Sequence, residues 1–227
     1  AGATETRDGP SRLESEILGR VPAFVIANGL GEPYLTEVDA QGKRSGTVYL
    51  GLRDAAAMLD EVRSFDKNAT LAIVPLSSVY SAVSKSASEA TAARAVLPQP
   101  IGSTSLDMRL FRLQPLSDER SEAAALVPGS SNVPLFYEPS LFLTVEGVQQ
   151  RPYFMRSADL LTTWERVNGS PSDEAVAPSR PRVRVRAVGL QNLLRTLEAG
   201  ELEVAPLLLP PSETAEVLNM PRKALLE

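Results

Sequence analysis

The residues that could carry out chemistry in this sequence are few, and their spacing favours structural roles. Ser64 and Lys67 are spaced like the serine and lysine of some acyl-transferring enzymes. The Ser-Asp-Asn and Lys-Thr-Gly motifs that accompany such a pair are missing, so we interpret Ser64 to Lys67 as the solvated end of a helix. Gly29 and Gly31 lack the third glycine and the following helix of a dinucleotide-binding loop, and Pro33 follows them, which favours a hairpin turn.

Composition and acidic pairs exclude further kinds of site. The chain has no histidine and no cysteine, which excludes imidazole proton shuttles, thiolate nucleophiles, disulfides and zinc fingers. Adjacent acids such as Asp60 and Glu61 rarely face each other across a cleft, as general acid–base catalysis requires. We therefore predict a protein that is not an enzyme, with no catalytic residue, no cofactor and no metal site.

The most conspicuous charge pattern is a run of alternating arginines, Arg180, Arg182, Arg184 and Arg186, interrupted by proline and valine. On a strand this spacing places the arginines on one face and the valines on the other. Such a row could bind a phosphate, an anionic lipid head group or an acidic protein. It could equally be the solvated face of a strand that resists edge-to-edge pairing.

The elements that would position these residues occur twice along the chain. Val21-Pro22-Ala23-Phe24 opens one run of predicted strands and helices, and Val133-Pro134-Leu135-Phe136 opens a second run in the same order. Each run reads β-β-β-α-β-α-β-α, with segments 84–105 and 168–181 lacking a counterpart. The sequence predicts an α/β protein with mixed (α+β) sheets and an internal duplication. We divide it into an N-terminal extension (1–20) and two pseudo-symmetric halves (21–128 and 129–227).

Strand aromatics are the candidates for binding a polypeptide. Two sheets whose helices cannot cover every face would leave apolar grooves, and an extended or unfolded chain binds such grooves. Core packing would explain the same residues equally well. The predicted partner-binding residues are Phe24, Tyr34, Phe136, Phe142, Tyr153, Arg182, Arg184 and Arg186.

Length, charge and hydropathy narrow the range of partners. At 227 residues and 43% hydrophobic content the chain can bury a sizeable core. Its net charge of −5 argues against nucleic acid as a partner, because phosphate contacts need a concentrated positive surface. No apolar run approaches the roughly 18 to 20 residues of a membrane span, so the sequence predicts no span and leaves peripheral membrane association open.

Several motifs of this sequence occur in the same order as in a known protein family, which the chain therefore resembles. Phe111-Arg112-Leu113-Gln114-Pro115, Val133-Pro134-Leu135-Phe136, Leu143-Thr144-Val145 and Pro152 to Leu160 occur in the order found in the twenty-two-kilodalton component of the Tic family. That component is a chloroplast import protein with cyanobacterial relatives. The resemblance covers roughly Val21 to Leu218 and implies a two-halved α/β protein that catalyses no reaction.

The resemblance also implies a function, a location and partners. It implies a chaperone-like or adaptor component of plastid protein import that binds precursor or unfolded client proteins and contacts the translocon. The implied location is the chloroplast, in the intermembrane space or at the envelope, with the thylakoid as the alternative. The alternative function is a peripheral structural subunit docked on a larger plastid membrane complex, a translocon or a photosystem. An enzyme of unknown type would require a deep polar pocket with convergent acids or lysines.

Overall fold

The computed structural model describes residues 12–35, 37–38, 44–80, 83, 94–96, 105–107, 111–119, 133–169 and 182–214. It has two five-stranded β-sheets, a separate two-stranded sheet and several helices, which confirms the predicted α/β class. The chain divides into two compact units, Ala1–Leu113 and Gln114–Glu227. The predicted boundary between the repeat halves, after residue 128, lies outside the described residues and stays a prediction.

The first unit is built on a five-stranded sheet. The strands follow the order β2-β3-β1-β4, and β7 also pairs with β3. A separate pair of short antiparallel strands, β5 and β6, lies partly within the segment 84–105 that has no counterpart in the other half. The elements are α1 (Arg12–Leu18), β1 (Pro22–Ala27), β2 (Glu37–Val38), β3 (Arg44–Tyr49), α2 (Leu52–Arg63), β4 (Thr70–Pro75), the 3-10 helix η1 (Leu76–Ser78), β5 (Arg94–Val96), β6 (Ser105–Asp107) and β7 (Phe111–Gln114).

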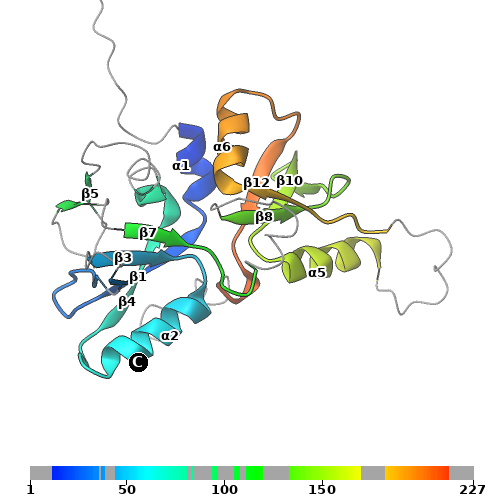
Figure 1. Cartoon of the computed structure of the whole chain (residues 1–227). Helices are drawn as coiled ribbons and strands as arrows, with labels where there is room; N and C mark the ends of the chain where they lie inside the picture. Colours follow the sequence, from blue (N-terminus) through cyan, green and yellow to red (C-terminus); the bar gives the residue numbers. More distant parts are fainter. Residues whose placement is uncertain are drawn as a thin grey trace, which may run out of the picture. The chain divides into compact units, whose positions relative to one another are not determined.

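Hydrophobic spacing explains how α2 covers this sheet. Ala55, Leu59 and Val62 fall on one side of the helix, and all three are buried against a core that contains Phe24 and Tyr49. Figure 1 shows α2 running along the sheet beside β1 and β4. All six residues of β1 are buried, and because successive side chains point to opposite faces of a strand, both faces of β1 are covered.

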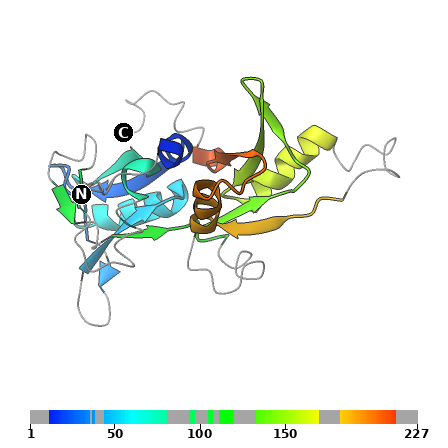
Figure 2. The same cartoon turned by 90° about the horizontal axis from the view of Figure 1, so that it is seen from above.

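The second unit contains the other five-stranded sheet. Its strands follow the order β11-β8-β10-β12, and β9 also pairs with β10. Phe136 and Phe154 on the sheet pack against Leu160 and Trp164 of α5, and Figure 2 shows α5 beside the hairpin formed by β9 and β10. The elements are β8 (Pro134–Tyr137), β9 (Leu143–Val145), β10 (Val148–Phe154), α5 (Ser157–Asn168), β11 (Arg186–Gly189), α6 (Leu190–Glu198) and β12 (Ala205–Leu209).

The two sheets share one pairing scheme. β8, β9, β10, β11 and β12 pair with one another as β1, β2, β3, β4 and β7 do. The register also agrees, because Phe24 lies opposite Tyr49 and Phe136 lies opposite Phe154. The amide of Leu76 donates to the carbonyl of Val21 at 2.7 Å, and the amide of Leu190 donates to the carbonyl of Val133 at 2.8 Å. The sequence repeat therefore corresponds to two sheets of equal topology, while the origin of the repeat by duplication stays a prediction.

Within the described ranges, no helix has both the length and the apolar character needed to cross a lipid bilayer.

Candidate partner-binding surfaces

Three of the predicted partner-binding aromatics lie in the cores. Phe24 and Phe136 are 0% exposed, and Tyr153 is 5% exposed. Phe24 and Phe136 each belong to a core between a sheet and its covering helix, where an aromatic strand residue finds a large apolar area to bury, whereas Tyr153 lies outside these two clusters and contacts Tyr137. Because strand periodicity places these rings on a buried face, the sequence alone does not separate a core aromatic from one that lines a surface.

Tyr34 has a different environment and belongs to what we name the apolar tip, formed by Leu30, Tyr34 and Phe65. The turn that carries Leu30 passes close to the segment after α2, because a Cβ atom on Gly29 would lie 3.3 Å from the Cβ atom of Asn68. Leu30 is 81% exposed and Phe65 is 71% exposed. The rings of Tyr34 and Phe65 meet edge to face, with their centroids 6.4 Å apart. The tip thus presents bulky apolar side chains to solvent at one end of the first unit.

A hairpin turn holds Leu30 in place, as Gly29 and Gly31 predicted. The side-chain oxygen of Asn28 accepts hydrogen bonds from the amides of Leu30 and Glu32, both at 2.9 Å. Gly31 takes a φ of 81°, in the left-handed region that glycine adopts without strain. This turn projects Leu30 away from the sheet.

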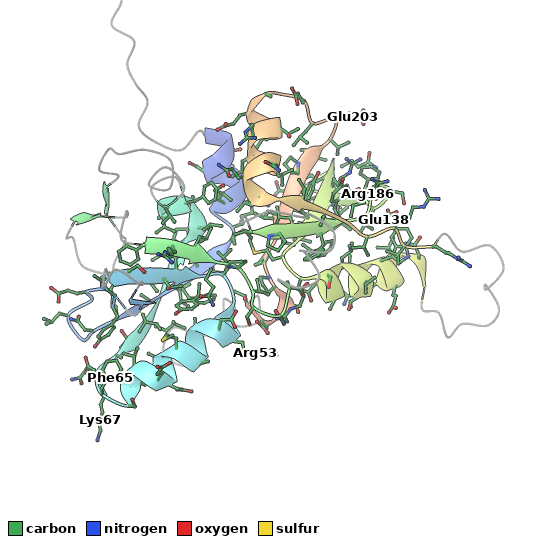
Figure 3. The ribbon with its side chains drawn as sticks, viewed as in Figure 1. Arg53, Phe65, Lys67, Glu138, Arg186 and Glu203 are labelled. Carbon is green, nitrogen blue, oxygen red and sulfur yellow. The ribbon has the colours of Figure 1, made fainter. Side chains whose placement is uncertain are left out.

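The other part of the tip follows the end of α2. Ser64 caps that helix and its hydroxyl donates to the carbonyl of Glu61 at 2.7 Å, so Ser64 to Lys67 form the solvated helix end that the sequence predicts. Figure 3 shows Phe65 and Lys67 at this end of α2. The Tyr34 hydroxyl donates a hydrogen bond to the Asp66 carboxylate. That bond raises the pKa of Tyr34 to about 12 and lowers the pKa of Asp66.

The arginine row lies in the second unit. Arg182, Arg184 and Arg186 are all exposed, while Val183 and Val185 are half-buried against the core under α5. The alternation of exposed arginines and half-buried valines is as predicted, but of these residues only Arg186 belongs to a strand, because β11 begins there. Residues 182–185 keep the alternating burial without a described partner strand.

Aromatic residues continue the face on which Arg186 lies. Arg186 is opposite Tyr137 in the β8–β11 pair, and the rings of Tyr137 and Tyr153 are 5.1 Å apart. Burial raises the pKa of Tyr153. Phe142, the remaining predicted aromatic, is half-buried and lies under the guanidinium of Arg151, which is 5.1 Å from the ring centroid.

A partly buried ion-pair cluster around Arg156 was not predicted as a unit. The guanidinium lies 3.1 Å from Asp118, 3.2 Å from Glu213 and 3.8 Å from Glu119. Burial works against the charged form of Arg156, yet the hydrogen bond to Glu213 and the surrounding carboxylates raise its pKa. Within the described part of the chain, no three acidic side chains gather closely enough to hold a metal ion.

The cluster connects three segments of the second unit, residues 118–119, 156–159 and 212–213. Asp159, in the first turn of α5, accepts hydrogen bonds from the amide and the hydroxyl of Ser212 at 2.9 and 2.7 Å. The only sequence signal for this arrangement is that acids follow Ser117 and Ser212, and such acids are also typical of helix starts. The cluster holds the start of α5 in place and has the character of a structural site.

The chain is similar to known proteins in sequence and in fold. The model of the Tic22-like family matches residues 3–216 of the chain. Among solved structures, Tic22 from Plasmodium falciparum matches with a TM-score of 0.66 and 16% identity, covering 90% of this chain and 95% of that chain. Anabaena Tic22, described as a protein of protein transport, matches with a TM-score of 0.63 and 19% identity, covering 92% of this chain and 97% of that chain. At these identities both structures show a common fold. No curated protein sequence gives a significant match.

Proposed function

This chain belongs to the Tic22-like family, and from that premise we propose that it is a non-catalytic, chaperone-like or adaptor component of plastid protein import. In this proposal it binds precursor or unfolded client polypeptides and contacts subunits of the translocon. Its location is the plastid, in the intermembrane space or at the envelope. The description of Anabaena Tic22 as a protein of protein transport supports this assignment.

The apolar tip is the observation that carries the client-binding part of the proposal. Leu30 and Phe65 expose most of their side chains although each would gain from burial. The ring of Tyr34, which is half-buried, contacts the ring of Phe65 edge to face. A small exposed apolar patch of this kind fits the scattered hydrophobic side chains of an unfolded chain. We assign client contact to Leu30, Tyr34 and Phe65.

An aggregation assay with a chemically unfolded model enzyme tests this assignment. The wild-type chain should suppress light scattering after dilution from denaturant. The double variant Leu30→Ser, Phe65→Ser should require several-fold more protein for the same suppression, because two anchoring contacts are lost, each worth about 1.5–3 kcal/mol when fully buried. The matched control is Val148→Ser, Val167→Ser, which removes two apolar side chains of the second unit that are 53% and 55% exposed. Equal loss in both variants would refute the assignment to the tip, and a wild-type chain that neither suppresses aggregation nor associates with translocon subunits would refute the proposed function.

A second candidate is a peripheral structural subunit of a larger plastid membrane complex. The exposed arginine row favours it, because it offers a charged surface suited to docking. Stoichiometric copurification with a membrane complex after a salt wash, together with no effect on aggregation of unfolded clients, would select this function over the first.

A further inference from the structure

We infer that the outer edge of β11, together with residues 182–185 that lead into it, binds an extended acidic segment of a partner protein, which adds to the sheet as a further strand. This site is separate from the apolar tip. The inference goes beyond client binding at the tip and does not depend on it, so each can fail alone.

The backbone at this edge is the first step of the argument. β11 pairs with β8 from Arg186 opposite Tyr137 to Gly189 opposite Pro134. In the part of the sheet that the structure describes, β11 ends the strand order and no strand lies on its other side. An edge strand presents amide and carbonyl groups that another chain can pair with. Strand addition is a common way for proteins to bind extended peptides.

The segment before β11 extends this edge and is held in position. Val183, Val185 and Ala187 pack against the core that contains Phe136 and Trp164. Figure 1 shows the chain running without a turn into β11. Because the half-buried valines hold the backbone before any partner arrives, less ordering entropy is lost on binding than for a free segment.

Charge then selects the partner. Arg182, Arg184 and Arg186 are exposed at every second position, and no described carboxylate forms an ion pair with them. Glu138, labelled near Arg186 in Figure 3, is buried and already accepts hydrogen bonds from the amide and hydroxyl of Ser140 at 2.6 Å. A strand with acids at every second residue has the same repeat of about 6.6 Å, so each carboxylate meets one guanidinium.

The arginines also disfavour pairing of the β11 edge with most other strands, and this effect is compatible with binding of an acidic strand. Charged side chains on an edge strand disfavour pairing with apolar or basic strands. The same charges favour an acidic strand, so the edge is selective rather than closed. A lipid surface or a free phosphate would use the arginines but would leave the backbone edge unpaired.

The test uses the full chain and a labelled peptide of alternating glutamate and valine. The triple variant Arg182→Gln, Arg184→Gln, Arg186→Gln should bind the peptide about tenfold or more weakly, since three charge-assisted contacts at a solvent-exposed edge are lost together. The matched control is Arg20→Gln, Arg166→Gln, Arg195→Gln, which removes three exposed arginines elsewhere and should leave affinity within about twofold. Equal weakening in both variants would mean unspecific attraction and would overturn the inference.

Amide hydrogen exchange separates strand addition from side-chain contact. Binding of the peptide should slow exchange of the outward-facing amides in residues 182–189. If the peptide binds with unchanged exchange at these amides, strand addition is wrong. Vesicles containing an anionic phospholipid form the second arm: binding of the wild-type chain to vesicles but not to the peptide, abolished by the triple variant, would replace the polypeptide with a membrane surface and overturn the inference.

Discussion

The hydrogen bond between Tyr34 and Asp66 is the clearest electrostatic feature at the scale of single residues. Tyr34 donates to the Asp66 carboxylate across 32 positions of sequence. The bond favours the neutral phenol and the charged carboxylate, which raises the pKa of Tyr34 to about 12 and lowers the pKa of Asp66, with the amide of Asn68 also lowering the latter. The hydrogen bond holds the turn after α2 close to Tyr34, whose ring contacts Phe65.

We predict that Asp66→Asn returns the pKa of Tyr34 toward its ordinary value near 10, because the charged acceptor is lost. A pH titration followed by NMR of ring-labelled tyrosines measures it. The folded state binds the phenolic proton more tightly than the unfolded state does. The stability that Tyr34 contributes is therefore present below pH 10 and is lost as the pH rises from about 10 to about 12. The variant should lose less stability over that interval.

Tyr153 is the internal control for this titration. Its pKa is raised mainly by burial, and it lies in the second unit, so Asp66→Asn should leave its titration unchanged. A Tyr34 titration that stays near pH 12 in the variant would contradict the assigned cause. The sequence predicts that Ser64 to Lys67 are solvated, but it contains no signal for a pair between residues so far apart.

Arg156 shows the same limit for charged residues. The acids after Ser117 and Ser212 suit helix starts by local rules, yet Asp118, Glu119 and Glu213 converge on one guanidinium. Local sequence reports the propensity of a residue for a turn or a cap. It does not report which distant charge lies above that turn in the fold.

At the scale of elements, the contact between β3 and β7 depends on one glycine. A Cβ atom on Gly46 would lie 2.4 Å from Cε1 and 2.7 Å from Cδ1 of Phe111, and 3.0 Å from the carbonyl oxygen of Tyr34. Phe111 is 5% exposed, so its ring has little free space to move into. The ring therefore packs directly on the glycine backbone, a close approach that explains the glycine in this strand.

We predict that Gly46→Ala destabilises the chain by about 1–3 kcal/mol through overpacking. Chemical denaturation measures the change in the free energy of unfolding. Phe111→Leu provides the partner of a double-mutant cycle: the smaller side chain should make room for the new methyl group, so the double variant should lose less than the sum of the single losses. Additive losses would show that the clash with Phe111 is not the cause.

The sequence predicts an element well where the spacing of apolar residues determines its buried side. It predicts an element less well where the bounds of a strand depend on pairing with another strand. The spacing of Ala55, Leu59 and Val62 places them on one side of α2, so the buried side of this helix can be read from the sequence. The alternation of arginine with proline and valine in residues 180–186 fits a strand, but within the described residues only Arg186 to Gly189 pair with β8. Burial alternates with period two in any extended segment that lies on a core. A partner strand is a separate condition that hydrophobicity does not record.

At the scale of the whole molecule, the repeat of Val-Pro-x-Phe was the most informative sequence feature. It predicted two runs of elements, and the two sheets have equal strand pairing around Phe24 and Phe136. The recognised motifs predicted the family. Binding surfaces were harder to predict. The residue type is the same for an aromatic buried on a strand and for one exposed after a helix, and only the surrounding fold decides which of them is covered.

The two compact units give the last prediction, which concerns cooperativity. Phe24 and Phe136 occupy equivalent positions in the two cores, and both are fully buried. Each of the substitutions Phe24→Leu and Phe136→Leu should cost about 1–3 kcal/mol. Because the contacts of each phenylalanine lie within its own unit, Phe24→Leu should speed amide exchange in β1, β3 and β4 by about tenfold for each 1.4 kcal/mol while leaving β8, β10 and β12 unchanged. Phe136→Leu should give the reverse pattern. Hydrogen exchange followed by mass spectrometry resolves the two sheets, and faster exchange in both sheets from either substitution would show that the units unfold as one.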